Sequence, residues 1–434
     1  MQKHFFYILL VLLAFGYSAK AQTPVDTLQL SLNQAIELGL KENLNLKNAN
    51  LDYLVAKKKV WEVTAAGLPQ ATATGTYTYL PKLPMIDFGG SPMELGVHNS
   101  RAIDGTATQL IFNGEWIVGL QAASVYERLQ NKTLYQTEYK TRESIISAYN
   151  SVLIIEESYK NLSSTLDATS KLYENTKALN QQGFIEESDV DQLKIMINNL
   201  SSGVETLHNQ IDVVNMLLKM QLGVEFNQPI KLTNTLNQLV ELAPIQPITA
   251  DSFDVKSSVE YQLAETAETL SKLSLRREYT KFLPTLAGFY AYHHSLTDEA
   301  LAFQAENTFG LKLSIPILTG GARLATLSQA KLNYKKAQNS KILAQQGLTT
   351  EYLATRNGYI SAYNTYLNSK ESMELGFKVY NKTVVKYQEG VVTSMELTTS
   401  QNQYLLAQKS FYEAELNLLN AKAKLERLLT NANN

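Results

Sequence analysis

Apolar residues recur at helical spacing along most of this chain. Between Leu32 and about Gly67 they stand three or four positions apart, with Lys, Glu and Asn between them. This spacing is typical of an amphipathic helix, which has one apolar face and one solvated face. Ser31, followed two residues later by Asn33, offers a helix start. We therefore expect one helix over residues 32–67.

Two later patterns predict much longer helices. The helical spacing runs unbroken from Gly114 to Gln182 and again from Gly321 to Glu389. At a rise of 1.5 Å per residue, each such helix would reach about 100 Å. Periodic patterns of this length without internal caps indicate coiled coils. Shorter return helices are expected at about 188–222 and 394–429.

Four short segments alternate between apolar and polar or small residues, which is the pattern of β-strands. They lie at 71–79, 102–112, 286–294 and 307–317. We expect two strand hairpins, within 68–113 and 281–318, with loops near 81–100 and 295–306. The first of these loops is rich in Pro and Gly, which indicates a surface loop.

The expected strands have an apolar face and a polar or small face, and their length suits a tilted strand that crosses a membrane. The alternative is a small soluble sheet packed on helices. Four strands cannot close a barrel, and an open strand edge cannot sit in lipid. The membrane interpretation therefore requires an oligomer, and three copies would supply twelve strands.

The chain also looks like one unit used twice. Gly183 and Gly390 lie 207 residues apart in similar surroundings, and so do Gly114 and Gly321. We therefore predict two internal repeats joined by a connecting segment, in which three prolines interrupt the helical pattern. The expected boundaries are 22–223 for the first repeat, 224–254 for the connecting segment, 255–430 for the second repeat and 431–434 for a tail.

Residues 1–21 have the pattern of a secretory signal peptide. A short polar start precedes an apolar run over 5–15, which is too short to span a bilayer. Ala19-Lys20-Ala21 then offers an Ala-x-Ala cleavage site before Gln22. The alternative is a buried N-terminal helix. Export is the better interpretation, and we expect no transmembrane helix in the mature protein.

Composition excludes several kinds of site. The chain has no cysteine, so it has no disulfide, no thiolate metal site, no cysteine nucleophile and no lipid-anchored cysteine. A net charge of −2 argues against a nucleic-acid partner. Walker, Rossmann and Gly-x-Ser-x-Gly patterns do not occur. His293 and His294 adjoin at the expected end of a strand, and we interpret them as a solvated loop pair rather than a metal site. We expect no enzyme activity, cofactor or metal.

The order of helix, hairpin, long helix, turn and return helix, used twice, resembles the outer-membrane efflux (TolC-like) family along nearly the whole chain. Five short motifs occur in that family's order. They are Leu30–Leu40 with Asn43-Leu44, Gly67-Leu68-Pro69, Phe282-Leu283-Pro284, Ile315–Gly321 and Tyr387-Gln388-Glu389-Gly390. The resemblance implies a mostly α-helical chain with a membrane β-barrel. It implies a homotrimer with a twelve-stranded barrel in the outer membrane and a helical tube in the periplasm.

The resemblance also implies a function. Such a trimer is a passive exit duct of a tripartite efflux system or a type I secretion system. Its partners are a periplasmic adaptor, an inner-membrane pump reached through that adaptor, and outer-membrane lipid. The alternative is a periplasmic coiled-coil scaffold without a channel.

In this family the tube closes at its periplasmic end through polar contacts near the two turns. The matching positions give a candidate gate of Ser188, Asp189, Tyr387 and Glu396. The alternative is helix capping, because Thr393 and Glu396 form a capping-box pattern and Asp189 falls in a first helical turn. Val392 stands where the resemblance expects a basic residue, so the closing network is thinner here.

Each turn between a long helix and its return helix ends in exposed apolar residues, which can form a partner site. The alternative is that they only serve the geometry of the turn. The resemblance makes the partner the periplasmic adaptor. The candidate contact residues are Gly183, Phe184, Ile185, Gly390, Val391 and Val392.

Overall fold

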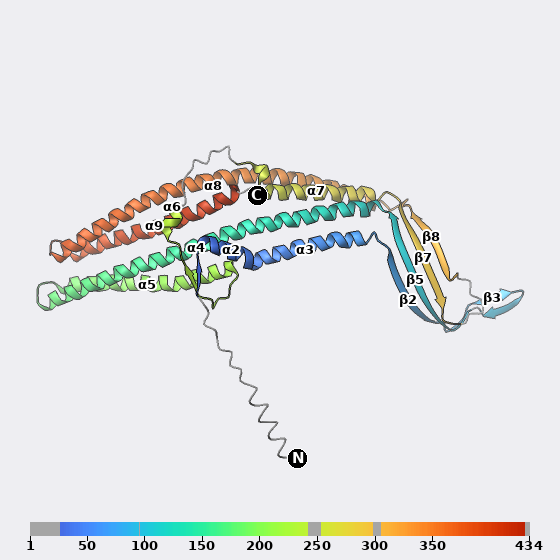
Figure 1. The fold of residues 1–434 in the computed structure, drawn as a ribbon, viewed down its shortest axis with the longest axis horizontal. Coiled ribbons are helices and arrows are strands. Elements are labelled where there is room, and N and C mark those ends of the chain that lie inside the picture. The colour runs from blue at the N-terminus through green and yellow to red at the C-terminus, as the bar shows by residue number, and fades with distance from the viewer. Residues whose placement is uncertain (1–26, 95, 242–252, 298–304, 430–434) are drawn as a thin grey trace, which may run out of the picture. The chain divides into compact units, whose positions relative to one another are not determined.

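The computed structural model describes residues 27–94, 96–241, 253–297 and 305–429 (Figure 1). The expected signal peptide 1–21 and the tail 431–434 lie outside these residues. The chain divides into two compact units, which we describe separately. The tip unit comprises the described residues of Met1–Asn43, Ser144–Pro244 and Tyr363–Asn420. The sheet unit comprises Leu44–Glu143, Ile245–Ala362 and Ala421–Asn434.

Two very long helices dominate the chain, as the periodicity predicts. Helix α4, Gly114–Gln181, has 68 residues, and α8, Ala322–Gln388, has 67. Each is followed by a return helix of 36 residues, α5 at Glu187–Leu222 and α9 at Ser394–Leu429. The four helices confirm the expected segments to within about two residues at each end, which is the usual uncertainty of helix boundaries.

The prediction of a single helix over residues 32–67 is wrong. The structure has α2, Leu32–Glu42, and α3, Leu44–Ala65, with a break at Asn43. Asn43 has a ψ of 127°, outside the helical region, and its side-chain amide donates to the Gln221 carbonyl of α5 at 2.7 Å. That bond supplies a partner for a carbonyl at the end of α5, where no intrahelical partner exists. The expected start is confirmed, because Ser31 and Gln34 form a capping box.

A four-stranded antiparallel sheet forms the strand region of the sheet unit (Figure 1). Its order is β2 (Gln70–Tyr79), β5 (Asn99–Phe112), β7 (Thr285–Ser295) and β8 (Asn307–Ser314). The four predicted strands are therefore confirmed. The last strand ends at Ser314, three residues earlier than expected, because Pro316 has no N–H to donate to a ladder.

The segment 81–100 is not only a loop. It contains a small hairpin of β3, Met85–Phe88, and β4, Ser91–Glu94. Gly89 and Gly90 form its turn with φ values of 68° and 91°. Two central residues with positive φ are what a tight two-residue hairpin turn of type I′ requires, and glycine adopts them without strain.

The register of the four-stranded sheet separates its two faces. On one face Tyr290 lies opposite Phe309, and Leu286 lies opposite Leu313. Phe309 is 78% exposed and Leu313 is 59% exposed. On the other face Thr106 lies opposite Ala291, with alternate threonines of β2 beyond. The sheet therefore has one exposed apolar face and one face of polar and small residues.

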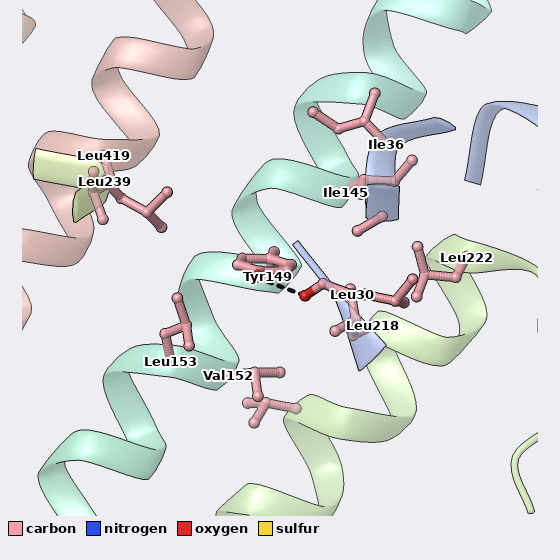
Figure 2. Packing of buried hydrophobic residues seen from close by; sticks show 12 residues of the cluster. Leu30, Ile36, Ile145, Tyr149, Val152, Leu153, Leu218, Leu222, Leu239 and Leu419 are labelled. Carbon is pink, nitrogen blue, oxygen red and sulfur yellow. Dashed lines mark hydrogen bonds between the residues drawn. The ribbon is translucent and has the colours of Figure 1, made fainter. Parts of the chain in front are cut away.

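The core of the tip unit forms where short N-terminal and connecting elements cover α4 and α5. Strand β1, Leu28–Leu30, pairs in parallel with β6, Ile230–Leu232, and α6 follows at Leu236–Glu241. Fully buried Tyr149 of α4 donates its hydroxyl to the Leu30 carbonyl at 3.0 Å (Figure 2). Apolar residues within 224–241 of the expected connecting segment thus pack in this core, and 242–252 lie outside the described residues.

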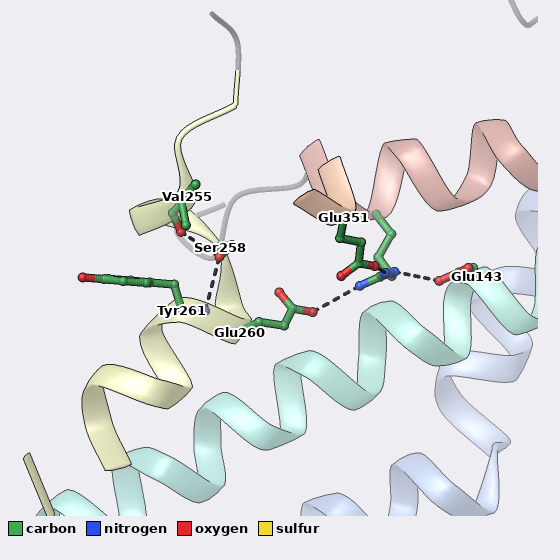
Figure 3. A network of polar contacts seen from close by, with 7 residues as sticks. Glu143, Val255, Ser258, Glu260, Tyr261 and Glu351 are labelled. Carbon is green, nitrogen blue, oxygen red and sulfur yellow. Dashed lines mark hydrogen bonds and ion pairs between the residues drawn. The ribbon is translucent and has the colours of Figure 1, made fainter. Parts of the chain in front are cut away.

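A single arginine joins four helices of the sheet unit. After the 3₁₀ turn η2, Val255–Ser257, helix α7 runs over Val259–Thr280. Arg427 of α9, whose side chain is 13% exposed, contacts Glu143 of α4 at 2.8 Å, Glu260 of α7 at 3.2 Å and Glu351 of α8 at 2.8 Å (Figure 3). Because the three carboxylates share one guanidinium, all three ion pairs would be lost if Arg427 were replaced.

Candidate functional site

The first tip of the tip unit is the turn between α4 and α5. Gly183 has a φ of 79°, and the Phe184 N–H donates to the Leu179 carbonyl at 3.0 Å. This is the Schellman arrangement, which needs a residue in the left-handed region and therefore favours glycine. The Asn180 side-chain amide adds a bond to the Ile185 carbonyl at 2.7 Å. Phe184 is 75% exposed, whereas Ile185 is half-buried.

The second tip, between α8 and α9, repeats this backbone. Gly390 has a φ of 70°, and the Val391 N–H donates to the Lys386 carbonyl at 2.8 Å. Val391 is 70% exposed, and Met395 beside it is also exposed. Val392 is half-buried and packs against the neighbouring apolar cluster. The structure therefore leaves one large apolar side chain of each predicted contact triplet open to solvent.

Tyr387, the central residue of the candidate gate, is a core residue within its own chain. It is 8% exposed and packs in an apolar cluster with Leu193 and Leu397. Burial raises the pKa of the Tyr387 hydroxyl, the Thr176 hydroxyl opposes this shift, and the Asp189 carboxylate adds to it. Although Thr176 lies close by, the buried Tyr387 hydroxyl makes no hydrogen bond of ordinary geometry to another described residue.

The other candidate gate residues lie at helix starts. The Ser188 hydroxyl donates to the Glu186 carboxylate at 3.3 Å, and Asp189 falls in the first turn of α5. The Glu396 N–H donates to the Thr393 hydroxyl at 3.3 Å, which is one half of the expected capping box. The structure thus brings Tyr387 and Asp189 into electrostatic range, while Ser188 and Glu396 remain exposed.

Sequence reasoning missed a polar seam along α8 and α9. Tyrosines recur every seventh residue of α8, interrupted once by Met373. The buried members are Tyr352, Tyr359, Tyr366, Tyr380 and Tyr387. On α9 the same spacing gives buried Gln401, Gln408 and Glu415. This heptad recurrence, which marks the facing positions of coiled coils, was the available signal.

Hydrogen bonds and stacked rings hold the seam within the tip unit. The Gln401 amide donates to the hydroxyls of Thr169, at 3.0 Å, and Tyr380, at 3.3 Å. The rings of Tyr380 and Tyr404 stack at 5.7 Å between centroids, and the Gln408 amide donates to the Tyr404 hydroxyl at 3.1 Å. Unlike an apolar coiled-coil core, the contact layer around Gln401 and Gln408 is built from polar groups that hydrogen-bond to one another.

The adjacent histidines do not form a solvated loop pair, and that expectation is wrong. Both lie within β7, where His293 contacts the Asp104 carboxylate of β5 at 2.7 Å and His294 lies 3.8 Å from Glu306. Across the part of the chain that the structure describes, no three His, Asp or Glu side chains gather closely enough to hold a metal ion. Nor is any helix of that part both long and apolar enough to cross a membrane.

Comparison with solved structures identifies the fold. The outer membrane protein VceC of Vibrio cholerae is similar with a TM-score of 0.76 at 14% identity, covering 92% of this chain and 96% of VceC. The CmeC outer membrane channel of Campylobacter jejuni gives 0.78 at 14% identity, covering 92% and 85%. At these identities the likeness shows a shared, mostly helical fold.

Comparison of sequences gives the family. The model of the family described as outer membrane efflux protein matches residues 280–431. Outer membrane protein TolC of Escherichia coli K12 is 22% identical over 440 residues, covering 94% of this chain and 85% of TolC. The family match falls on β7, β8, α8 and α9, and the similarity to TolC extends over most of the remaining elements. Residues 280–431 are therefore identified with the outer membrane efflux protein family, and the chain as a whole is similar in sequence to TolC.

Proposed function

We propose that this chain forms a homotrimeric exit duct that passively conducts substrates across the outer membrane and periplasm. In this proposal the duct is the outer component of a tripartite efflux or type I secretion system. Residues 1–21 are the export signal, and 22–223 and 255–430 are the two repeats. The family relationship supports an efflux duct, since the relatives are outer membrane proteins and channels.

The observation that carries this proposal is the four-stranded sheet. Among the described residues, β2 and β8 are its outer strands, and each is paired on one side only. Its apolar face is exposed, with Leu311 at 71% and Ile317, just beyond β8, at 92%. An open edge next to lipid would leave backbone groups without partners, at several kcal/mol each. Pairing β8 of one copy with β2 of the next in a closed trimer removes every edge.

The long helices support the second half of the proposal. Helices of 68 and 67 residues reach about 100 Å at 1.5 Å per residue. A conduit through the periplasm needs this reach, and a passive conduit needs no catalytic group of its own. The exposed apolar tip residues then fit contact with a periplasmic adaptor, which would connect the duct to an inner-membrane pump.

Disulfide trapping tests the trimer directly, because the chain has no cysteine of its own. Ala73→Cys on β2 would be combined in turn with cysteines at Phe309, Leu311 or Leu313 on β8. Within one chain these strands are separated by two others, about 14 Å, which is beyond the reach of a disulfide. We expect one combination to give covalently linked trimers in outer-membrane fractions, with each single-cysteine variant as the control.

The scaffold alternative predicts a different result. A coiled-coil scaffold without a channel would extract from membranes in buffer alone and would show no link between β2 and β8 in any combination. Native mass spectrometry in mild detergent provides the second measurement. A monodisperse monomer would remove the barrel from the proposal.

A further inference from the structure

Glu415 is a buried acid in the helical wall of the tip unit. It lies on α9 and is 2% exposed. An ionised carboxylate in such a place is unfavourable unless a cation pairs with it, so the group tends to hold a proton. Burial is the main reason that the pKa of Glu415 is raised to about 7; the Glu157 carboxylate contributes to this rise and the Lys370 ammonium opposes it.

The surroundings of Glu415 come from three helices. From α4, the Glu157 carboxylate lies within electrostatic range of it, and the Asn161 amide donates to Glu157 at 3.1 Å and to the Tyr412 hydroxyl. From α8, Tyr366 and Lys370 lie within electrostatic range. On α9 itself, Tyr412 stands one turn before it. The titratable and charged groups that interact with Glu415 are thus Glu157, Tyr366, Lys370 and Tyr412.

A groove runs beside this layer. A groove of about 610 Å³ between α4, α5 and α9 is lined by Ser158, Gln408 and Tyr412 among others. Glu157 is itself 42% exposed at its side chain, and Lys160 lies 3.8 Å from it on the exposed side. Solvent therefore comes close to Glu415 while the helices stay folded.

We propose that Glu415 is a proton-operated lock on the packing of α4, α8 and α9. With the proton bound, the three helices close on a neutral side chain. When the proton leaves for water, the carboxylates of Glu415 and Glu157 repel each other between α9 and α4, and the packing loosens. The proposal is carried by the near-complete burial of Glu415 and by the cluster that Glu157, Asn161 and Tyr412 form one helical turn away, and it does not depend on the proposed export function.

The sign of the effect follows from linkage. The folded chain holds the Glu415 proton more tightly than the unfolded chain, whose ordinary value is 4.5. The contribution of Glu415 to the stability of the folded chain is therefore full below pH 4.5, and it is lost as pH rises through about 7. Loosening above neutral pH acts on helices that carry both tips, so the lock would couple tip packing to the pH of the surrounding compartment.

Hydrogen exchange of the full chain in detergent tests the lock. After correction for intrinsic rates, amides of α9 around Glu415 should lose protection by on the order of tenfold between pH 5.5 and 8.5. Glu415→Gln, a neutral isostere, should keep its protection at pH 8.5 and lose the pH dependence. Glu413→Gln is the matched control, because that side chain is 64% exposed on the same helix and its variant should behave like the parent.

Two further variants keep the test decisive. Glu157→Gln removes the like charge and should move the midpoint of the transition to lower pH, even where Glu415→Gln fails to fold. His208→Gln tests the histidine that contacts Tyr159 of α4, with ring centroids 6.0 Å apart, and should leave the midpoint unchanged. An unchanged midpoint in Glu157→Gln would contradict the lock. So would a parental pH dependence in Glu415→Gln, or a loss of the pH dependence in His208→Gln.

Discussion

The two tips share one backbone and differ in the side chains on it. Asn180 and Tyr387 stand at the same place, three residues before each tip glycine. Asn180 bonds the tip backbone from a partly solvated position, whereas Tyr387 is buried among apolar side chains. The helix after the first tip begins with Glu187 and Asp189, and the helix after the second has only Glu396 in its first turn.

This difference separates what sets the shape of each turn from what gives each tip its surface chemistry. Helix ends and a left-handed glycine set the shape of the turn, and they do so identically at both tips. The side chains then give the first tip two acidic residues and an exposed phenylalanine, whereas the second tip has an exposed valine and a buried tyrosine. We infer that the second tip is anchored to the core through Tyr387, while the first tip is held mainly by its own backbone and by Asn180. Substitutions at matched positions can break this comparison.

The largest effect is expected from charge at both exposed tip residues. Phe184→Asp combined with Val391→Asp should abolish export while trimers form normally, because both side chains are solvent-exposed in the free chain. An unpaired charge buried against the adaptor would cost several kcal/mol. Dye accumulation in cells that carry the cognate pump and adaptor measures this loss.

The single variants sharpen the comparison of the two tips. Phe184→Asp should reduce export more than Val391→Asp, since phenylalanine buries more apolar area in a contact. Phe184→Leu with Val391→Leu is the control and should export nearly normally. Full export by the double aspartate variant would place the adaptor contact elsewhere on the chain.

A smaller effect is expected from opening the resting end of the tube. We propose that Tyr387 reaching Asp189 holds it shut, since the Asp189 carboxylate lies within electrostatic range of the Tyr387 hydroxyl. A hydrogen bond to a charged group contributes about 1.5–3 kcal/mol. Tyr387→Phe with Asp189→Ala should therefore raise single-channel conductance in planar bilayers at unchanged trimer stability.

Glu396→Ala is the matched variant at the second tip. It should conduct like the parent, because Glu396 lies exposed at the start of its helix and its N–H meets the Thr393 hydroxyl. The opposite pattern, with Glu396→Ala open and the double variant closed, would assign closure to an acidic ring and leave Tyr387 as packing.

Local periodicity was enough to predict the elements that dominate the fold. The long helices, their return helices and the four strands carry strong patterns over many residues, so the predictions for them were confirmed. The break at Asn43 was missed, because it depends on a bond to Gln221, 178 residues away. The pairing of β1 with β6 was missed for the same reason, since three-residue strands have no period of their own.

The candidate site also has features that local sequence predicts and features that depend on distant contacts. The tip glycines were predictable, since turn chemistry is local and only glycine adopts these φ values without strain. The burial of Tyr387 and Glu415 was not, because it depends on which helices surround them. The heptad spacing of tyrosines on α8 was visible in the sequence, but tyrosine suits both an exposed and a buried face. Only packing decides between the two.

Replacing either tip glycine should cost the same small amount. Gly183→Ala and Gly390→Ala each place a side chain in the left-handed region, at about 1 kcal/mol. An added Cβ meets nothing within 4 Å at either position, so backbone strain is the whole effect. Gly358→Ala, inside α8 and equally open, should stabilise by about 0.5–1 kcal/mol instead.

Hydrogen exchange at the two tips and thermal unfolding in detergent would measure these glycine variants. Equal losses would show that the shared backbone sets the stability of both turns. A clearly larger loss at Gly390 than at Gly183 would mean that the second tip is under additional constraint in the assembled protein, contrary to the equality expected here.

The smallest expected effect isolates the one polar bond that distinguishes the tips. Asn180→Ala removes the 2.7 Å bond to the Ile185 carbonyl and should destabilise the first tip by about 0.5–1.5 kcal/mol. Faster amide exchange over residues 183–187, with no change over 390–394, is the expected result. Asn180→Asp is a useful second variant, because a carboxylate cannot donate to a carbonyl and should also lose the bond. Unchanged exchange in both variants would show that the Schellman backbone alone holds the first tip, and the contrast with Tyr387 would then be one of burial rather than of bonding.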